Sequence, residues 1–276
     1  MAIIGETGQY TGEHSIKLRT KVGKAGWGNW IDFCANWHLV PDGPPIVEPP
    51  ALKSQTLNLP GSDGVIDLTE AITGFPLYDQ RQGSWSFFVL GGWDKWYWTY
   101  SSILNEIHGK DVQVILNDDP EWFYNGRLTI SAPKSDKGRN SLTLDYNFDP
   151  YKISLNESIG DSWLWDPFRF PDGVIPSGLT KDIEVTNSKT IRLPASVIGR
   201  RPLTPNFIVA QDSNFTRIRL YNPELNGNAY IQKTNIVVGD NHWMDMIISG
   251  FNSGNECRIE IVGTGTLSIV YRQGKL

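Results

Sequence analysis

A chain of 276 residues is long enough for one large domain or two ordinary ones, and either can bury a core without metal or disulfide support. Its net charge of −5, with no long basic run, argues against nucleic acid as a bound ligand. The N-terminal sequence lacks the pattern of a secretory signal, and no run of about 18 apolar residues predicts a spanning helix. We therefore expect a soluble protein made in a cytoplasm.

The first distinctive segment is rich in proline and glycine. Prolines at positions 41, 44, 45, 49 and 50 fix φ and favour extended backbone, so residues 37–55 are expected to form a stiff arm lying across a surface. Short strands are predicted at 56–59 and 65–68, on either side of the turn PGSDG. Gly61 and Gly64 allow the positive φ that such a turn needs.

The next segments predict a β-rich domain with one helix. Residues 77–90 alternate around DQRQG and resemble one hairpin, and apolar residues at three- and four-residue steps predict a helix over 96–108. A second hairpin is predicted around NDDPE, followed by a third strand that stops before Pro150. Its three strands are expected at residues 112–116, 122–131 and 141–148. We assign residues 1–152 to this N-terminal domain.

The remaining residues, 153–276, predict a second domain. Residues 153–196 look less regular, and strand signals then recur about every ten residues with Asn, Gly and Asp between them. The predicted strands are 204–210, 216–221, 229–232, 246–250, 258–262 and 266–272. This spacing is typical of a β-sandwich.

A search for catalytic motifs favours a protein that is not an enzyme. The four histidines stand apart, and the sequence has no nucleophile elbow, zinc-protease motif or phosphate-binding loop. Asp118 and Asp119 precede a proline, an ordinary way to build a turn. Cys34 and Cys257 match no zinc spacing and are expected to be small buried thiols. We predict no catalytic residues, cofactor or metal.

The aromatic residues have two interpretations. Trp93, Trp96, Tyr97 and Trp98 crowd the start of the predicted helix, so they cannot all face one core, and some are expected to contact another subunit. In the second half, core packing is the commoner role for aromatic side chains. The alternative is a platform on which sugar rings stack, with its candidate residues being Trp163, Trp165, Tyr230 and Trp243.

Ordered motifs across residues 37–152 carry a family resemblance. They are WHLVP, LPGSDGVIDLTE, YDQRQGSWSFF, LNEIHGK, VQVILNDDPEWFYNGRL and LDYNFDPYK. In this order and spacing they resemble the distal tail protein (Dit) family of siphophages. The ending GTGTLSIVYRQGKL resembles the C-terminal ends of two-domain members, whereas residues 153–197 match much less.

The resemblance implies a fold and a place in the virion. The N-terminal domain would be a split β-barrel or sandwich similar to tail-tube proteins, and the C-terminal domain a galectin-like or carbohydrate-module-like β-sandwich. The chain would form a homo-hexameric ring at the distal end of the phage tail. This ring would join the tail tube protein to the baseplate, to tail-associated hub proteins and to receptor-binding proteins. DNA would only pass through the lumen, whose acidic wall would repel phosphate.

Closing a ring requires head-to-tail contacts between different surfaces of one chain. We expect the proline-rich arm to reach a neighbouring subunit. The residues predicted to form or support this interface are Trp37, Pro41, Leu59, Pro60, Ile66 and Leu68. The alternative function is adhesion to host cell-wall carbohydrate through the C-terminal domain.

Overall fold

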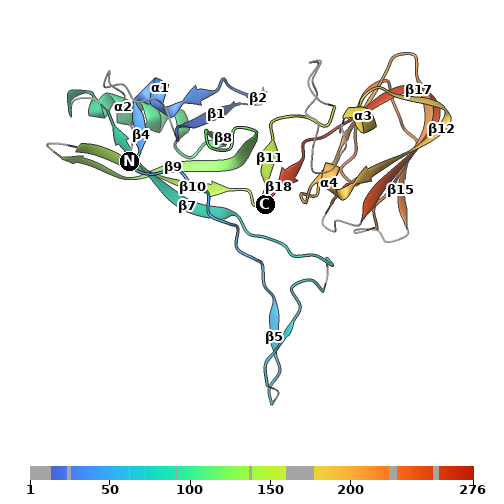
Figure 1. Cartoon of the computed structure of the whole chain (residues 1–276), viewed down its shortest axis with the longest axis horizontal. Helices are drawn as coiled ribbons and strands as arrows, with labels where there is room; N and C mark the ends of the chain where they lie inside the picture. The colour runs from blue at the N-terminus through green and yellow to red at the C-terminus, as the bar shows by residue number, and fades with distance from the viewer. Residues whose placement is uncertain are drawn as a thin grey trace. The chain divides into compact units, whose positions relative to one another are not determined.

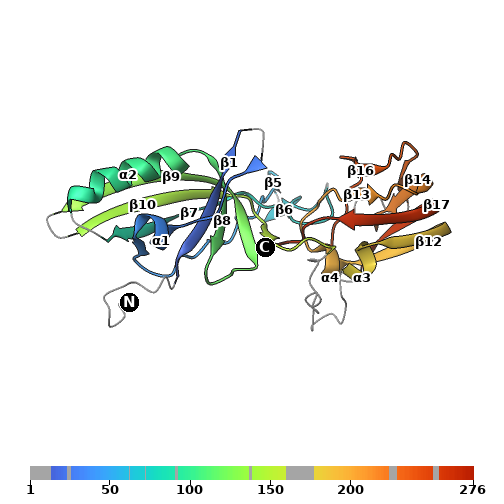
Figure 2. The same cartoon turned by 90° about the horizontal axis from the view of Figure 1, so that it is seen from above.

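The computed structural model describes residues 14–23, 26–61, 63–71, 73–90, 93–136, 139–159, 177–223, 229–250 and 255–276. The chain forms two compact units (Figures 1 and 2). One contains the residues up to Ser54, Leu77–Ile153 and the terminal Leu276, and the other contains Gln55–Pro76 and Ser154–Lys275. The mainly-β fold class is confirmed. A division into separate domains at Lys152 stays a prediction.

The first unit is built on an antiparallel sheet with strand order β2-β1-β8-β9-β10-β7-β4. The strands of this path are β1 (Ile16–Val22), β2 (Gly26–Trp27), β4 (Leu39–Pro41), β7 (Arg81–Val89), β8 (Asp111–Leu116), β9 (Trp122–Asp136) and β10 (Arg139–Phe148). The short strands off the path include β3 (Ile31–Asp32) beside β1 and β11 (Lys152–Ser154) beside β9. The β8–β9 hairpin and the third strand confirm the sequence prediction.

Two helices pack with this sheet. The predicted helix is confirmed as α2 (Trp93–Ile107), which lies along β9 (Figure 2). The expectation of a single helix is wrong, because α1 (Phe33–Trp37) also forms, and the second unit has the short helices α3 (Ser177–Thr180) and α4 (Ala195–Ile198). Asp32 caps α1 by accepting hydrogen bonds from the backbone N–H groups of Cys34 and Ala35.

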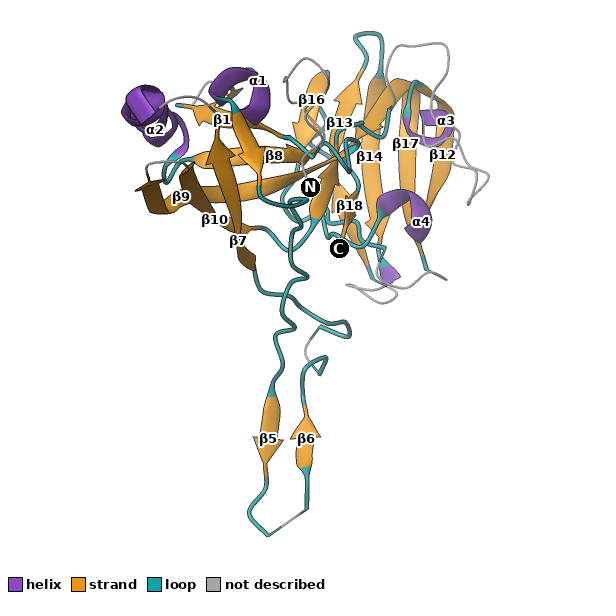
Figure 3. Cartoon of the chain, turned by 60° about the vertical axis from the view of Figure 1, so that its left-hand side comes forward, coloured by secondary structure: helices purple, strands orange, loops and turns teal. Residues whose placement is uncertain are grey.

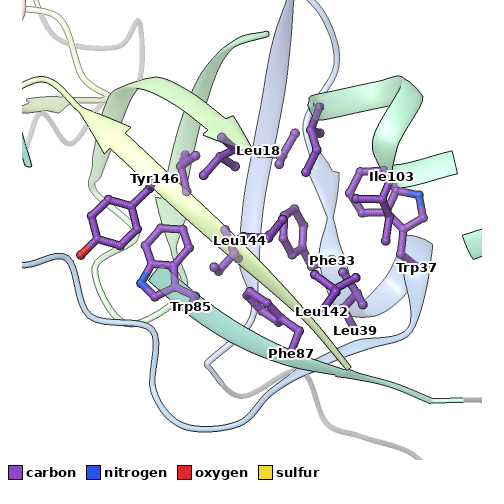
Figure 4. Close-up of a cluster of buried hydrophobic side chains, with 14 of the residues drawn as sticks. Leu18, Phe33, Trp37, Leu39, Trp85, Phe87, Ile103, Leu142, Leu144 and Tyr146 are labelled. Atoms are coloured by element: carbon purple, nitrogen blue, oxygen red, sulfur yellow. The ribbon is translucent and has the colours of Figure 1, made fainter. Parts of the chain in front are cut away.

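The core of the first unit lies between these helices and the sheet. Leu18, Phe33, Phe87, Ile103 and Leu144 are completely buried there and point toward one another (Figure 4). Side chains alternate along the strands, so one face of the sheet carries the apolar residues of this core.

The hairpin predicted over residues 77–90 is wrong. Residues 81–89 form one continuous strand, β7, which pairs with β10 on one side and β4 on the other. The predicted turn sequence DQRQG contains Arg81, and that side chain is buried, with its guanidinium donating to the carbonyl oxygens of Glu48 and Pro150. The polar residues of DQRQG therefore lead into the start of a strand and do not form a hairpin turn.

The second unit is organised around one long strand, β17 (Glu256–Val270). On one side, β12 (Ile183–Pro194) pairs with β17 from residue 256 to residue 267. On its other side β17 pairs first with β14 (Asn214–Tyr221) and then with β13 (Asn206–Val209). The outer strands are β15 (Tyr230–Lys233) beside β14 and β16 (Gly239–His242) beside β13. The sheet therefore divides into two half-sheets that share β17, one formed with β12, β14 and β15 and the other with β13 and β16.

Glycines allow this change of partner. At Gly263, a Cβ atom would lie 2.3 Å from the carbonyl oxygen of Asn214, and one at Gly265 would lie 2.3 Å from Oγ of Ser213. The sequence interpretation placed a break here and predicted two strands, which is wrong. Ile259 and Leu267, on either side of the glycines, are both buried on the same face.

Two other expectations for this unit are corrected. Residues 153–196, expected to be irregular, contain the twelve-residue strand β12. Residues 246–250 form no strand, and only Ile248 makes a single bridge, with Leu203. The last short strand is β18 (Gly274–Lys275). The galectin-like character of the unit stays a prediction.

Candidate interaction surface

The proline-rich segment lies on the sheet of its own unit. Prolines lack an N–H group and cannot extend the ladder of backbone hydrogen bonds in a sheet. Side chains of β7 and β10 instead make the hydrogen bonds that hold the backbone of this segment. Trp85 Nε1 donates to the carbonyl oxygen of Ile46 at 2.7 Å, and the hydroxyl of Tyr146 accepts from the N–H of Glu48 at 2.9 Å. The stiff arm predicted from the sequence is therefore anchored on its own sheet over residues 46–48.

Arg81 adds a buried cation to this anchor. Burial lowers the pKa of its guanidinium from the ordinary value, an effect that the nearby rings of Tyr124 and Tyr146 partly offset. Burial also raises the pKa of both phenols. The Arg81 guanidinium lies 5.7 Å from the ring centroid of Tyr124 and donates to the carbonyl oxygen of Glu48 at 3.0 Å. A buried arginine with these partners holds the segment in one position.

The chain then continues into residues 51–79, whose two ends meet at an isolated antiparallel bridge between Leu52 and Tyr78. The N–H of Lys53 donates to the carbonyl oxygen of Leu77 at 2.9 Å, and that of Asp79 donates to Ala51 at 2.8 Å. The ammonium of Lys53 lies 3.5 Å from the carboxylate of Asp79. These contacts hold the two segments side by side.

Between these two segments the chain forms the hairpin of β5 (Thr56–Asn58) and β6 (Val65–Asp67), which Figure 3 shows as a separate ladder. Both predicted strands and their turn are confirmed, and Gly61 and Gly64 have φ of 83° and 82°. In the ladder Leu57 lies opposite Ile66.

One side of this hairpin is apolar. Successive side chains of a strand point to opposite faces, so Leu59 and Leu68 continue the side that carries Leu57 and Ile66. These four residues, which we call the apolar hairpin face, are each 39–47% exposed. Thr56, Asn58, Val65 and Asp67 belong to the opposite face, and every residue of both strands is exposed.

A hairpin of this kind needs a partner. Two isolated strands are marginal in water, and contiguous exposed apolar side chains mark interaction sites. Polar contacts stabilise its base, where the N–H of Leu68 donates to the carbonyl oxygen of Gln55 and the N–H of Thr69 donates to the carboxylate of Asp67. The hydrogen bonds from Thr69 lower the pKa of the Asp67 carboxyl. The apolar hairpin face is therefore the best candidate for a contact surface.

The predicted interface residues fall into two groups. Leu59, Pro60, Ile66 and Leu68 are exposed on the hairpin, whereas Trp37 and Pro41 are buried in the first unit. The latter two can support an interface only indirectly. Sequence reasoning missed Leu57, although its alternation with Leu59 was visible. The interface itself stays a prediction.

Aromatic residues of α2 separate into core and surface. Trp96 is buried and stacks with Tyr100 at a centroid distance of 5.7 Å. Tyr97 and Trp98 are among the most exposed large side chains in the described part of the chain, at 77% and 70%. Contact of these two residues with another subunit stays a prediction, and the side chain of Trp93 lies outside the described residues.

The proposed sugar platform is only partly described. Trp163 and Trp165 lie outside the described residues. Tyr230 is exposed on β15, whereas Trp243 follows β16 and packs on the core residue Phe207 at 5.5 Å between ring centroids. Because β15 and β16 are the outer strands of different half-sheets, these two rings do not stand in one row of the sheet.

The polar residues weighed as catalytic candidates have structural contacts. His14 pairs with Asp118 at 2.8 Å, and His108 Nδ1 accepts from the N–H of Ile130. Asp119 belongs to the predicted turn, and its carboxylate pairs with Lys152 at 2.5 Å. The described residues hold no group of His, Cys, Asp or Glu suited to a metal, and no helix among them could cross a bilayer. Neither Cys34 nor Cys257 forms a disulfide, and Cys257 is buried as expected whereas Cys34 is only partly buried.

Comparison with solved structures finds a crystal structure of the SPP1 Dit protein (gp 19.1), described as "a paradigm of hub adsorption apparatus in Gram-positive infecting phages". The TM-score is 0.53 at 14% identity, and the alignment covers 95% of this chain and 99% of the other. The two chains share a fold. Comparison with family models finds no match, and comparison with curated proteins finds none either.

Proposed function

We propose that this chain is a structural distal tail protein of a siphophage. The observation that carries the proposal is the fold likeness to SPP1 Dit, which extends over nearly the full length of both chains. In this role the chain forms a hexameric ring at the distal end of the tail. The ring joins the tail tube to the baseplate and tail-associated proteins, lets DNA pass and performs no catalysis.

The apolar hairpin face supports ring formation. A ring closes through two different surfaces of each subunit, and in this proposal the hairpin of one copy contacts a different surface of the neighbouring copy. Covering Leu57, Leu59, Ile66 and Leu68 would remove apolar area from water at about 25 cal/mol per Å². This gain offsets part of the entropy cost of association.

Native mass spectrometry of the purified chain tests this proposal. The wild type is expected to give assemblies of six 31.0-kDa copies. Leu57→Asp combined with Ile66→Asp introduces two charges on the apolar hairpin face and is expected to give single copies, because an unpaired charge is costly to bury. Val65→Asp is the matched control, since Val65 lies on the opposite face of the same hairpin and is also exposed.

Circular dichroism must show that all three proteins are equally folded. Single copies of the wild type at every concentration up to the micromolar range would contradict the ring. Six-copy assemblies of the double variant would be consistent with a ring but would show that the apolar hairpin face is not one of its contacts. Deletion of Asp42–Ala51 is a poorer test, because it removes the acceptor of the buried Trp85.

A further inference from the structure

The outward face of the half-sheet formed by β12, β17, β14 and β15 carries an ordered row of arginines and tyrosines. Arg192 is the register partner of Arg258, Arg258 of Tyr221, and Tyr221 of Tyr230. The row thus crosses four strands, about 15 Å at ordinary strand spacing. Its residues point away from the core, because the next residues along β12 and β17 are buried. Figure 3 shows β14, β17 and β12 side by side.

The tyrosine rings hold the arginines in place. The guanidinium of Arg219 lies 4.4 Å from the ring centroid of Tyr230 and donates from Nε to Gln232 at 2.7 Å. That of Arg258 lies 5.4 Å from the ring of Tyr221, and the two rings are 5.5 Å apart. A guanidinium stacked on a ring keeps its planar N–H groups available and ordered, which is how arginine recognises carboxylate and phosphate.

Positive charge on this face exceeds negative charge. Glu256 pairs with Arg192 at 2.9 Å, and Glu260 is shared by Arg217 at 3.5 Å and Arg219 at 3.4 Å. Around the row, these four arginines and two glutamates give a local net charge of +2 in a chain whose net charge is −5; the exposed Glu184 lies on the same side of β12 but eight residues from Arg192. Within the described chain Arg258 is exposed and has no carboxylate within ion-pair distance.

The position of Arg258 calls for an anion. Its cross-strand neighbour is Arg192, and like charges directly opposite each other destabilise a sheet. Glu256 offsets only the charge of Arg192. An external carboxylate or phosphate placed over Arg258 would complete the charge pairing of the row.

We propose that this arginine–tyrosine face binds an anionic polysaccharide. Arg258, with Arg219 beside it, pairs with acidic groups of the polymer, and the exposed part of the Tyr230 ring contacts a sugar ring. Nucleic acid fits less well, because its binding sites contact more phosphates than this small charge excess can neutralise. Arginine and tyrosine are common at protein interfaces, but acidic residues are depleted at the cores of such interfaces, and Glu260 lies beside Arg219 and Arg258 at the centre of this face. An acidic protein is therefore the competing partner, and the polyglutamate titration separates it from a polysaccharide.

Binding of defined polymers to the full chain by isothermal titration calorimetry tests the proposal. Polygalacturonate supplies a carboxylate on each sugar, dextran is the neutral polysaccharide, and polyglutamate and oligo-dT supply acidic groups on other backbones. We expect polygalacturonate to bind and dextran not to bind. Polyglutamate and oligo-dT are expected to bind at least about tenfold more weakly, because they lack the sugar ring contact.

Single substitutions then locate the site. Arg258→Ala and Tyr230→Ala are each expected to weaken polygalacturonate binding about tenfold, and Arg258→Lys, which keeps charge but loses the planar fork, by less. Arg200→Ala is the matched control, because Arg200 is an exposed arginine of the same unit outside this half-sheet. Equal thermal unfolding of the variants shows that they are folded.

Three results would overturn the proposal. One is no heat of binding with polygalacturonate at millimolar galacturonate. Another is polyglutamate or oligo-dT binding as tightly as polygalacturonate, which would assign the face to an acidic protein or to nucleic acid. The third is equal affinity of Arg258→Ala and Arg200→Ala. The titration does not depend on ring formation, so its failure is distinct from failure of the proposed tail function.

Discussion

At the scale of single residues, a few buried polar groups decide where the proline-rich segment lies. Trp85 and Tyr146 occupy neighbouring strands, and their rings pack at a centroid distance of 4.6 Å. Their polar atoms meet the backbone of Ile46 and Glu48, which is remote from both in sequence. Such long-range contacts leave no local pattern, so the sequence predicted a stiff segment but not the surface that holds it.

Replacing the indole of Trp85 tests this anchor. Trp85→Phe keeps an aromatic ring but removes the donor to the carbonyl oxygen of Ile46. The unsatisfied acceptor and the lost packing are expected to lower the free energy of unfolding by about 2–4 kcal/mol. Urea unfolding followed by circular dichroism measures the change. The exposed Trp98 provides the control Trp98→Phe, which should change stability by no more than about 0.5 kcal/mol.

The buried phenol of Tyr124 predicts a pH dependence. Burial raises its pKa above the ordinary value of 10.0, so the folded chain keeps this proton to a higher pH than the unfolded chain. The stabilising effect is complete below pH 10.0 and is lost as pH rises toward the folded-state pKa. Stability of the wild type should therefore fall more steeply above about pH 10 than stability of Tyr124→Phe.

Urea unfolding at several values between about pH 8 and pH 11 measures this difference. Absorbance of the phenolate identifies the tyrosines that titrate late. Tyr146 contributes in both proteins because burial raises its pKa too, so the variant should retain part of the slope. Parallel pH profiles for the two proteins would contradict the assignment.

At the scale of elements, local patterns predicted strands and turns well where neighbours in sequence pair. The β8–β9 and β5–β6 hairpins have strong turn signals between alternating strands, and both form. The pattern failed for β12, because its middle residues 187–190 are polar and exposed and only its two ends alternate. It also failed for β17, where Gly263 and Gly265 look like a turn but accommodate close backbone.

The sequence likewise predicted only part of the candidate surface. Alternation around PGSDG predicted the hairpin, and Leu59, Ile66 and Leu68 lie on its apolar face. Trp37 and Pro41 were grouped with them because they belong to the same proline-rich stretch. The structure buries both, since α1 and β4 are part of the core of the first unit. Nearness in sequence does not reveal which residues of a stretch face solvent.

At the scale of the whole molecule, ordered motifs pointed to a fold that pairwise sequence similarity does not reveal. Identity to the solved SPP1 Dit structure is 14%, yet the alignment covers 95% of this chain. Conserved volume and alternation can be kept while residue identities change, since cores tolerate many apolar replacements. Residues 154–275 of the second unit show this limit, because the motif matched there, GTGTLSIVYRQGKL, begins inside β17 and leaves the other strands of the sheet unmatched. The two half-sheets became visible only in the structure.

Two separate cores predict two separate unfolding events. Leu144 belongs to the core of the first unit and Ile259 to that of the second, and both are completely buried. Each replacement by alanine should remove about 2–5 kcal/mol from its own unit. Differential scanning calorimetry is expected to show two transitions, the first lowered by one variant and the second by the other. The measurement is best made in the Leu57→Asp/Ile66→Asp background, in which the proposed contacts between copies are expected to be lost. A single transition lowered equally by Leu144→Ala and Ile259→Ala would show that the two cores unfold as one cooperative body.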